Sequence, residues 1–539
     1  MGRYALPVIA VALFIAFLRL GSFTLFDVDE AVFAQASKEM LASGNLVTPT
    51  YNGQDRFDKP ILIYWLMAAS YKAFGVNAFA ARFPSAAAAV LLALSIFFFT
   101  GLAARDASPW GEAESWQKKA FNAAVCLVLT VFFLVYSHAA VTDMTLTLFI
   151  TLSLFCFYLA AAKGRGGFIY GFYFFSALAF LTKGLIGVVF PFGIAFLYRL
   201  LFLRRVPKTA GRESVGRVWS ASGFLLFLAV GLPWYVAEYL ATGDEFIRNF
   251  FIKQHFVRYM HVISGHTGPF YYYVPVLALG LFPWIAYLPQ GVAGAFRQKG
   301  SSPGLLAVIW LSFVLVFFSF ARTKLPDYVL PAVPAAALLM GSGMSRACYT
   351  RYGMSGTGRL SNWFIAFAAL LMGAGLFLAK GYLLRAGIRA DWPYWIAGIM
   401  LLMAAFSAYA ALSGKSQNLV LALLMICLLS VAVLKAVPAA SEYLQGSLYR
   451  YSLYARENLR PDGVLIGYKI NNPSVVFYSG RRVVGAEDER ELRAALSGGS
   501  EAMIITKTGD AKEVDALIGP SLKLKLLESG GNYSLFEKK

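Results

Sequence analysis

The sequence predicts a polytopic α-helical membrane protein with a small α/β domain at its C-terminal end. Apolar residues of the types Ala, Val, Ile, Leu, Met, Phe, Trp, Tyr and Cys make up 58% of the 539 residues, and charged residues only 14%. Soluble domains carry roughly 25% charged residues, so most of this chain requires lipid as its solvent. Apolar runs of spanning length recur as far as residue 437, and a pattern of short strands and helices follows.

Thirteen apolar runs approach the roughly 20 residues that a helix needs to cross a bilayer. They lie at 5–23, 79–102, 120–137, 142–162, 167–181, 184–203, 219–240, 270–290, 304–320, 327–345, 362–382, 392–412 and 417–437. Two further apolar stretches, 30–43 and 61–75, are interrupted by charges, and we expect them to lie along the interface as amphipathic helices. The first run has no small-residue cleavage site, which favours an uncleaved first span.

The distribution of basic residues predicts the orientation. The net charge of +19 does not indicate nucleic-acid binding, because basic residues collect in the cytoplasmic loops of membrane proteins. They are densest in the loops after even-numbered runs, with six in the loop from Arg199 to Arg217. We therefore expect a bacterial inner-membrane protein with a cytoplasmic N-terminus and, after thirteen spans, a periplasmic C-terminal domain.

The domain boundary is predicted near residue 440. Residues 1–439 form the transmembrane domain, with the periplasmic loop and its interfacial helices at 24–78. Residues 440–539 form the α/β domain, with strands expected at 464–469, 502–506 and 522–527 and helices at 487–496 and 510–518. The four cysteines lie in or beside apolar segments without paired spacing, which argues against a disulfide or zinc framework.

Polar residues near membrane depth are energetically costly and therefore mark candidate sites. On the predicted external side they form four groups, which run from Asp27 to Lys59, from His138 to Asp143, from Asp244 to His266 and from Arg322 to Tyr328. Basic side chains suit an anionic phosphate, and the candidates are Lys59, Arg258, Arg322 and Lys324. A lipid-linked sugar phosphate would use both the basic and the acidic groups.

Each of these residues also has a structural interpretation. Asp29 and Asp143 each stand at the start of a predicted helix, where a carboxylate offsets the helix dipole. Lys59 and Lys183 stand at the ends of apolar segments, where a lysine can anchor the helix at the interface. The histidines of the third group have no spacing typical of a metal site, so the residues alone leave a metal open.

Several motifs in order resemble the bacterial aminoarabinose transferases (ArnT), which belong to the protein mannosyltransferase superfamily of GT-C glycosyltransferases. The motifs are Asp29-Glu30, Tyr51-Asn52-Gly53, Asp58-Lys59-Pro60, Thr142-Asp143, Leu181-Thr182-Lys183-Gly184, His255-Phe256-Val257-Arg258-Tyr259, Gly268-Pro269-Phe270 and Lys324-Leu325-Pro326-Asp327-Tyr328. The resemblance is dense over about residues 20–340. It implies a GT-C fold and an inverting transfer of a sugar from undecaprenyl phosphate to an acceptor, typically a lipid A phosphate.

The resemblance also implies roles for individual residues. It matches Asp29 and Asp143 to the family's functional aspartates, and we expect Glu30, next to Asp29, to be the third catalytic carboxylate. Lys59 and Arg258 match ligands of the donor phosphate.

Further matches concern the lipid-phosphate cavity and a metal. Tyr328 matches a tyrosine of that cavity, and Asp58 and His255 match a carboxylate–histidine pair for a divalent metal, which would be zinc, magnesium or manganese. The chain has Val32-Phe33 where the family often has Arg-Tyr, and Asp58 where lipid A enzymes commonly have Glu. These departures leave the sugar and the acceptor open.

Two alternatives remain at this level. Within the transferases, a protein hydroxyl or another periplasmic glycan is the second acceptor class. A transporter of lipid-linked sugars is the alternative from another functional class. A transporter would place its charges near the bilayer midplane in broken helices, whereas here they cluster at the predicted outer boundary.

Overall fold

The computed structural model describes nine stretches of the chain, which are residues 2–105, 113–205, 219–257, 267–297, 302–348, 353–385, 391–498, 501–516 and 524–538. The chain divides into two compact units. Unit 1 contains Met1–Leu18, Phe57–Ile63 and Pro84–Ala432, and unit 2 contains Arg19–Arg56, Tyr64–Phe83 and Val433–Lys539. Most of the first predicted loop therefore belongs to the same unit as the C-terminal residues. The domain boundary near residue 440, between the transmembrane domain and the α/β domain, stays a prediction.

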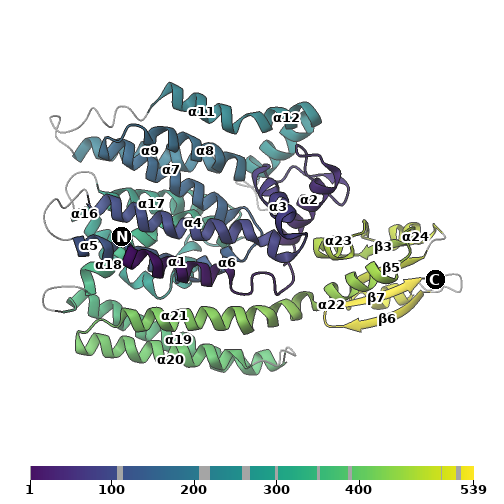
Figure 1. Ribbon diagram of the computed structural model, residues 1–539. Coiled ribbons are helices and arrows are strands. Elements are labelled where there is room, and N and C mark those ends of the chain that lie inside the picture. The colour runs from purple at the N-terminus through teal and green to yellow at the C-terminus, as the bar shows by residue number, and fades with distance from the viewer. Residues whose placement is uncertain are drawn as a thin grey trace. The chain divides into compact units, whose positions relative to one another are not determined.

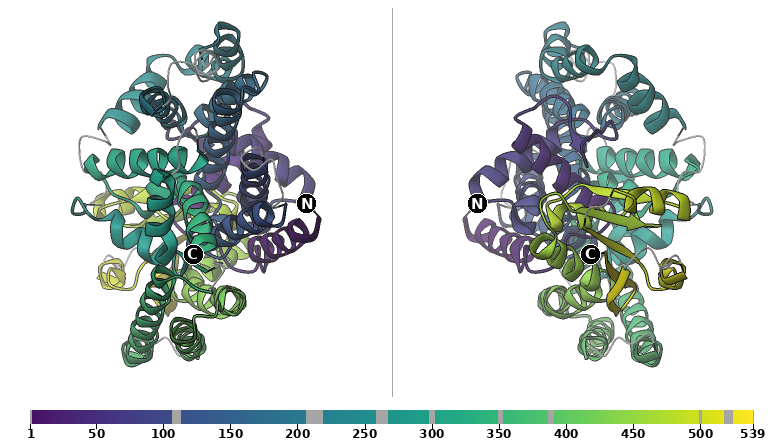
Figure 2. Two further views of the ribbon diagram at one scale, coloured as in Figure 1. Left: turned by 90° about the vertical axis from the view of Figure 1, so that its left-hand side faces the viewer. Right: turned by 90° about the vertical axis from the view of Figure 1, so that its right-hand side faces the viewer.

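Unit 1 is helical throughout, and most of its long helices run side by side in Figure 1 and are seen end-on in Figure 2. Helix α4 (Ala78–Arg105) starts in unit 2 and continues into unit 1. The other helices are α1 (Gly2–Phe17), α5 (Ala113–Val128), α6 (Val131–Ser137), α7 (Asp143–Lys163), α8 (Phe168–Lys183), α9 (Ile186–Arg205), α11 (Ala221–Gly231), α12 (Pro233–Thr242), α13 (Asp244–Phe246), α15 (Tyr273–Gly280), α16 (Leu288–Arg297), α17 (Pro303–Phe320), α18 (Val333–Cys348), α19 (Gly356–Arg385), α20 (Trp392–Ser413) and α21 (Asn418–Val431). Two segments are π-helices, η1 (Ile247–Val257) and η4 (Ala432–Ala436), and two are 3₁₀-helices, η2 (Trp284–Tyr287) and η3 (Pro326–Ala332).

The helices match the predicted spans in position. Within the described residues, seven helices are long and apolar enough to cross a membrane, or up to ten if each of three bent pairs is one span. Three shorter apolar helices, Tyr4–Phe17, Phe168–Lys183 and Ile186–Leu201, overlap the remaining predicted runs. The class of polytopic helical membrane protein is confirmed, and the total of thirteen spans stays a prediction.

The three bends have causes in the local sequence. Between α5 and α6 the axis turns by 61°, and there the Thr130 hydroxyl accepts the Phe133 amide and starts a new helix. Pro233 is the first residue of α12, after a bend of 40°. Pro283 stands in the break of 107° between α15 and the helix that follows. Proline lacks an amide hydrogen and disfavours helix in the preceding residue, so these breaks are local in origin.

Unit 2 combines two helices of the first loop with a mixed sheet. Helices α2 (Asp29–Ser43) and α3 (Leu62–Phe74) lie where the two interfacial helices were predicted, although their position relative to a membrane stays a prediction. The remaining elements are β1 (Thr50–Tyr51), β2 (Gln54–Asp55), α22 (Val437–Asn458), β3 (Val464–Tyr468), α23 (Pro473–Ser479), β4 (Val483–Ala486), α24 (Glu489–Leu496), β5 (Ala502–Lys507), α25 (Ala511–Ala516), β6 (Leu524–Gly530) and β7 (Tyr533–Lys538).

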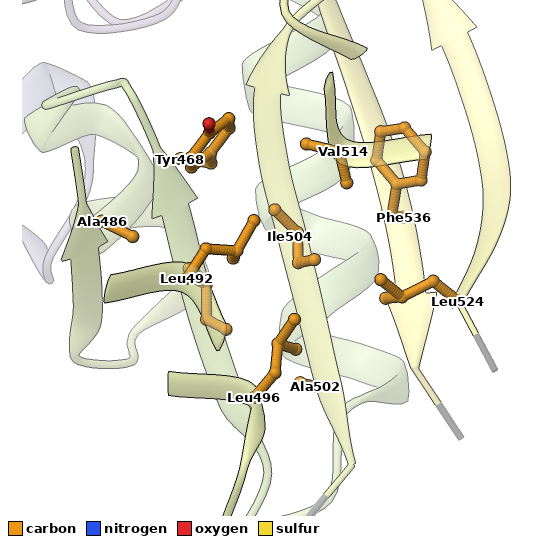
Figure 3. Close-up of a cluster of buried hydrophobic side chains, with 10 residues drawn as sticks. Tyr468, Ala486, Leu492, Leu496, Ala502, Ile504, Val514, Leu524 and Phe536 are labelled. Atoms are coloured by element: carbon orange, nitrogen blue, oxygen red, sulfur yellow. The ribbon is translucent and has the colours of Figure 1, made fainter. Parts of the chain in front are cut away.

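The five-stranded sheet has the order β4-β3-β5-β7-β6, in which β3 pairs in parallel with β4 and β5 while β7 pairs antiparallel with β5 and β6. Successive side chains of a strand point to opposite faces. Accordingly, Ile504 of β5 packs in the cluster with Leu492 of α24 (Figure 3), and Met503 packs in the cluster with Tyr451 of α22. The sheet is therefore covered by helices on both faces, which confirms the predicted α/β domain.

Candidate active site

Three charged side chains meet within unit 1. The Lys183 ammonium lies 2.5 Å from a carboxylate oxygen of Asp143 and 3.4 Å from one of Asp327. The exposed fractions of these side chains are 12%, 9% and 21% respectively. A single cation thus faces two largely buried carboxylates, so this cluster has a formal charge of −1 when all three groups are ionised.

The chain connectivity brings Asp143 and Lys183 together. Asp143 is the first residue of α7, and Lys183 is the last residue of α8. Only Gly164 to Gly167 separate the two helices, and the helices pack against each other. A connection this short makes neighbouring helices antiparallel, so the start of α7 meets the end of α8. Each charge also suits the dipole at its own helix end.

The glycines after Lys183 allow the turn into α9. Gly184 has φ +67° and ψ −137°, a conformation that side chains with a Cβ rarely adopt. A Cβ on Gly187 would lie 2.2 Å from the backbone carbonyl carbon of Ala179, so α9 approaches α8 as closely as its backbone permits. The Leu-Thr-Lys-Gly motif therefore ends one helix and places its lysine at the turn.

Asp327 and its neighbour Tyr328 come from the turn η3, which contacts α7. The Lys183 ammonium lies 5.6 Å from the centre of the Tyr328 ring, within range of a cation–π contact. The Tyr328 ring also packs at 4.9 Å from that of Phe318 in α17. This arrangement joins the predicted catalytic Asp143 to the predicted lipid-phosphate tyrosine.

A second polar group in unit 1 joins the first loop to η1. The amide nitrogen of Gln254 donates to the Asp58 carboxylate at 2.6 Å. The Lys59 ammonium donates to the backbone carbonyl of Asp58 at 3.1 Å. The Gln254 amide comes from a π-helix, a form that frequently occurs at functional sites. Two loops that the sequence placed on one side therefore do meet.

Two predicted residues that follow Gln254 in the sequence are not described. The side chain of His255, next to Gln254, and all of Arg258 lie outside the part of the chain that the structure describes. Within that part, no three His, Cys, Asp or Glu side chains are grouped as a metal site would require. The proposed metal pair and the phosphate ligand Arg258 both stay predictions.

Lys324 occupies a structural position. Its ammonium donates to the carbonyl oxygens of Ser319 and Ala321 at 2.8 Å each and of Phe318 at 3.4 Å, and the residue is only 4% exposed. These carbonyls belong to the end of α17, where a lysine satisfies groups without a helical partner. Arg322, in contrast, is exposed. The geometry of Lys324 favours a helix cap, whereas its predicted contact with phosphate stays untested.

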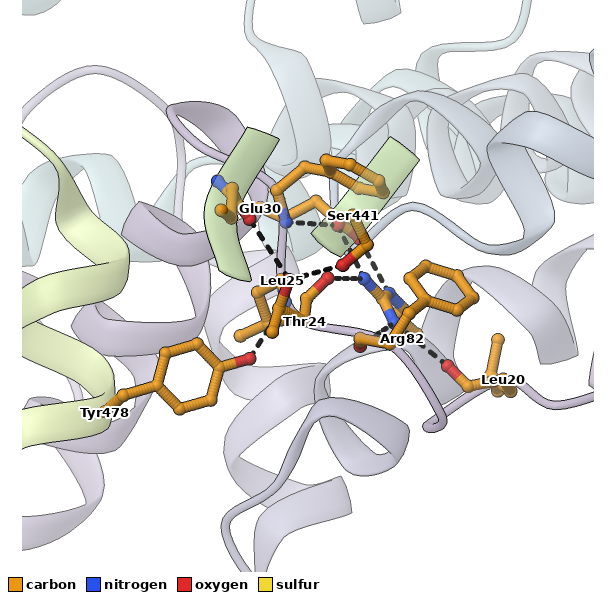
Figure 4. Close-up of polar contacts among 10 residues, drawn as sticks. Leu20, Thr24, Leu25, Glu30, Arg82, Ser441 and Tyr478 are labelled. Atoms are coloured by element: carbon orange, nitrogen blue, oxygen red, sulfur yellow. Dashed lines mark hydrogen bonds and ion pairs between the residues drawn. The ribbon is translucent and has the colours of Figure 1, made fainter. Parts of the chain in front are cut away.

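In unit 2 the neighbouring acids Asp29 and Glu30 differ in environment. Asp29, the first residue of α2, is exposed. The carboxylate of Glu30 is buried and receives hydrogen bonds from Arg82 Nε at 2.9 Å and Arg82 Nη2 at 2.8 Å (Figure 4). Its oxygen also accepts the backbone amide of Phe26 at 2.9 Å. This geometry favours a role for Glu30 in shaping the loop, beside the catalytic role predicted for it.

Four residues that contact one another or the predicted site residues were not identified as partners from the sequence. Lys183 was interpreted only as an interface anchor, and Asp327, Gln254 and Arg82 were given no role. The signal for Lys183 is a lysine in the last turn of one helix and an aspartate in the first turn of the helix before it. With a four-residue connection between the helices, that pattern predicts an ion pair.

The sequence profile of the dolichyl-phosphate-mannose-protein mannosyltransferase family (PMT) matches residues 3–243. Proteins named undecaprenyl phosphate-alpha-4-amino-4-deoxy-L-arabinose arabinosyl transferase are similar over longer stretches. The one from Sodalis glossinidius is 31% identical over 424 residues, which cover 77% of this chain and 72% of that protein. The one from Aeromonas hydrophila is 32% identical over 63% of this chain, and the match spans 59% of that protein's length.

The fold is also that of a solved relative. The crystal structure of ArnT from Cupriavidus metallidurans bound to undecaprenyl phosphate superposes with a TM-score of 0.79, covering 99% of this chain and 98% of that one at 24% identity. The GT-C architecture expected from the motifs is thereby confirmed. From the extent of the Sodalis match, the chain belongs to the family of undecaprenyl phosphate-α-4-amino-4-deoxy-L-arabinose arabinosyl transferases.

Proposed function

We propose that this protein is an inverting glycosyltransferase that moves aminoarabinose, or a similar sugar, from undecaprenyl phosphate to a phosphate of lipid A. The observation that carries the proposal is the similarity to the arabinosyl transferase of Sodalis glossinidius over most of both chains. The proposed reaction takes place on the periplasmic side of the inner membrane, with the N-terminus in the cytoplasm. Transfer of a labelled sugar in reconstituted membranes tests it.

The reaction forms one bond and breaks one. An oxygen of the acceptor phosphate attacks the anomeric carbon of the sugar, and the bond from that carbon to the donor phosphate breaks. Undecaprenyl phosphate leaves with the electron pair and gains negative charge. A fixed cation such as Lys59 would stabilise that charge more in the transition state than in the ground state, which is the condition for catalysis.

The buried cluster around Lys183 constrains the role of Asp143. The Asp143 carboxylate already accepts a hydrogen bond from the Lys183 ammonium at 2.5 Å. An anionic phosphate acceptor needs no general base, in contrast to a serine or sugar hydroxyl. We therefore assign Asp143 and Asp327 to positioning and charge complementarity. Their excess carboxylate suits the amino group of an aminosugar, which is a cation at neutral pH.

The position of the charges argues against the transporter alternative. Asp143 and Lys183 lie at the terminal residues of their helices, and neither helix is broken in its middle. A transport site at the bilayer midplane would use discontinuous helices. The match to the protein mannosyltransferase profile keeps a protein hydroxyl as the second acceptor class.

Replacing Lys59 by alanine should weaken donor binding. A charge-assisted hydrogen bond contributes about 1.5–3 kcal/mol, so the Kd for undecaprenyl phosphate should rise by roughly one to two orders of magnitude. Binding of the lipid to the purified variant measures this directly. Lys72→Ala, which removes an exposed lysine from the last turn of α3, is the matched control. An unchanged Kd in Lys59→Ala would reduce Lys59 to an interface anchor.

We further propose that Asp58 and His255 hold a divalent metal. Zinc and manganese bind both carboxylate and imidazole ligands. A hydrogen bond such as the one from Gln254 to Asp58 orients a carboxylate that binds a metal. The donor chemistry therefore fits. When bound, the ion would supply positive charge to neutralise a phosphate.

Metal analysis tests this assignment without reference to activity. The purified protein should contain about one divalent ion per chain, and Asp58→Ala should lose at least tenfold in metal affinity. Asp55→Ala, at an exposed acid three residues before Asp58 in sequence, should keep the ion. A metal-free protein with full activity in chelator would remove the metal from the mechanism.

A further inference from the structure

The segment before α2 is irregular, yet it is held by the C-terminal α/β domain within unit 2. The amide of Leu25 donates to the Tyr478 hydroxyl at 2.8 Å, and the hydroxyls of Thr24 and Ser441 are hydrogen-bonded at 2.6 Å (Figure 4). Thr24 also donates to Gln445 at 3.3 Å. Residues that are more than 400 positions apart in sequence therefore fix this segment.

Asp27 makes the most extensive of these contacts. One carboxylate oxygen accepts the Ser474 amide at 2.8 Å, and the other accepts the Ser474 hydroxyl at 2.5 Å and the Asn472 side-chain amide at 3.0 Å. Ser474 stands in the first turn of α23, and the residue at the N-cap position, Asn472, provides no side-chain cap itself. Asp27 thus satisfies donors at this helix end from the opposite end of the chain.

The other end of α23 is also held by the first loop. The Lys38 ammonium donates to the Phe477 carbonyl at 3.1 Å and lies 5.3 Å from the centre of its ring. Helix α23 therefore has an anion at its N-terminal end and a cation at its C-terminal end, both supplied by residues around α2. Asn52 adds two hydrogen bonds to the backbone of Val483 in β4, at 2.8 and 3.0 Å.

Burial increases the contribution of these contacts to stability. Burial raises the pKa of the Asp27 carboxyl, and the hydrogen bonds from Ser474 and Asn472 act in the opposite direction. Burial likewise lowers the pKa of Lys38. Removing the hydrogen-bond partner of a polar group that is shielded from water costs more free energy than removing the partner of an exposed group. Losing one partner of these contacts between the loop and α23 should therefore be costly.

We propose that the α/β domain is a positioning element for Asp29, and that Asp27 is the positioning residue through which it acts. Asp29 follows Asp27 by two residues and begins α2, so a fixed Asp27 restricts where the Asp29 carboxylate can lie. For its catalytic consequence, the inference rests on the proposed function and on the catalytic role that the family resemblance implies for Asp29. It assigns the C-terminal domain a part in the transfer step, in addition to its folding as an α/β unit.

The kinetic test compares kcat with donor affinity in the full-length protein. A catalytic group displaced by about 1 Å costs on the order of 10²-fold in rate, so Asp27→Ala should lower kcat by about that factor. The Kd for undecaprenyl phosphate should not change, because its proposed ligand Lys59 belongs to unit 1. Ser474→Ala should lower kcat less, and adding it to Asp27→Ala should cause little further loss.

Glu513→Gln is the matched control. This exposed carboxylate of α25 accepts hydrogen bonds from Lys469 and Tyr468 in the same domain and does not contact the loop residues named above. We expect its kcat to equal that of the wild type. A full kcat in a folded Asp27→Ala variant would overturn the proposal, and so would a loss of equal size in Glu513→Gln.

Hydrogen exchange separates this inference from the proposed function. In Asp27→Ala and in the milder Ser474→Ala, the amides of residues 24–32 should exchange faster while those of β5 keep their protection. Unchanged exchange in the loop would overturn the proposal whether or not the protein transfers sugar. A wild-type protein without transfer activity, but with the expected exchange, would contradict the proposed function and leave the structural tie standing.

Discussion

Lys183→Met should lower the stability of the protein and abolish sugar transfer. The substitution removes the only cation of the described Lys183 cluster and leaves Asp143 and Asp327 facing each other in a largely buried site. Breaking a buried ion pair by removing one partner costs about 3–5 kcal/mol. Removing a fixed charge from a preorganised site lowers turnover by about 10²–10³-fold. Thermal unfolding in detergent and the transfer rate measure the two effects.

A second substitution and a control variant test whether the effect of Lys183→Met comes from the ion pair. Asp327→Asn added to Lys183→Met removes one of the two like charges, so it should restore part of the lost stability without restoring transfer. Lys415→Met changes an exposed lysine of unit 1 in the segment after α20, and should change stability by less than about 0.5 kcal/mol. Equal stability of Lys183→Met and wild type would show that the ion pair is not formed.

Arg82→Met should have a comparable effect on unit 2. The guanidinium of Arg82 is completely buried, binds both oxygens of Glu30, and donates to the carbonyls of Leu20, Phe23 and Thr24 at 3.1, 3.0 and 2.8 Å. Its removal leaves a buried carboxylate without its cation, which costs about 3–5 kcal/mol. Arg82→Lys keeps the charge but lacks the planar fork, so it should recover only part of this loss. Thermal unfolding measures the series.

Glu30→Gln then distinguishes a structural from a catalytic role of Glu30. If the carboxylate mainly shapes the loop, stability and kcat should fall together, and Arg82→Met combined with Glu30→Gln should be more stable than Arg82→Met alone. If the carboxylate takes part in the reaction, kcat should collapse while the unfolding temperature stays near that of the wild type. We expect the first outcome from the three hydrogen bonds that hold the side chain.

The helices were predictable because lipid imposes a simple rule. Every backbone group must be bonded within its own segment in the membrane, so uninterrupted apolar runs mark helices, as the match of α7 and α20 to their runs shows. The bends were not predicted, although Pro233 and Pro283 stand at two of them. In the C-terminal domain, β4 was missed because it has four residues and lies at a sheet edge, and β7 because the turn after Gly530 was not recognised.

The site was predictable residue by residue, whereas its pairings were not. The motifs identify Asp143 and Tyr328 as candidates, but the partner of Asp143 is 40 positions further along the chain, in a motif interpreted as an anchor. The contact of Asp27 with Ser474 joins residues 447 positions apart. Neither hydropathy nor residue spacing predicts which loops contact each other, because these contacts depend on how the helices pack.

The direct test of the proposed function is sugar transfer by the purified full-length chain in vesicles. Undecaprenyl phosphate carrying labelled aminoarabinose is supplied with lipid A, and the products are identified by mass. We predict that the label appears on a lipid A phosphate with wild-type protein and not with Lys183→Met. Label that stays on the donor, crosses the membrane unchanged, or appears on a protein hydroxyl instead of lipid A would contradict the proposed function.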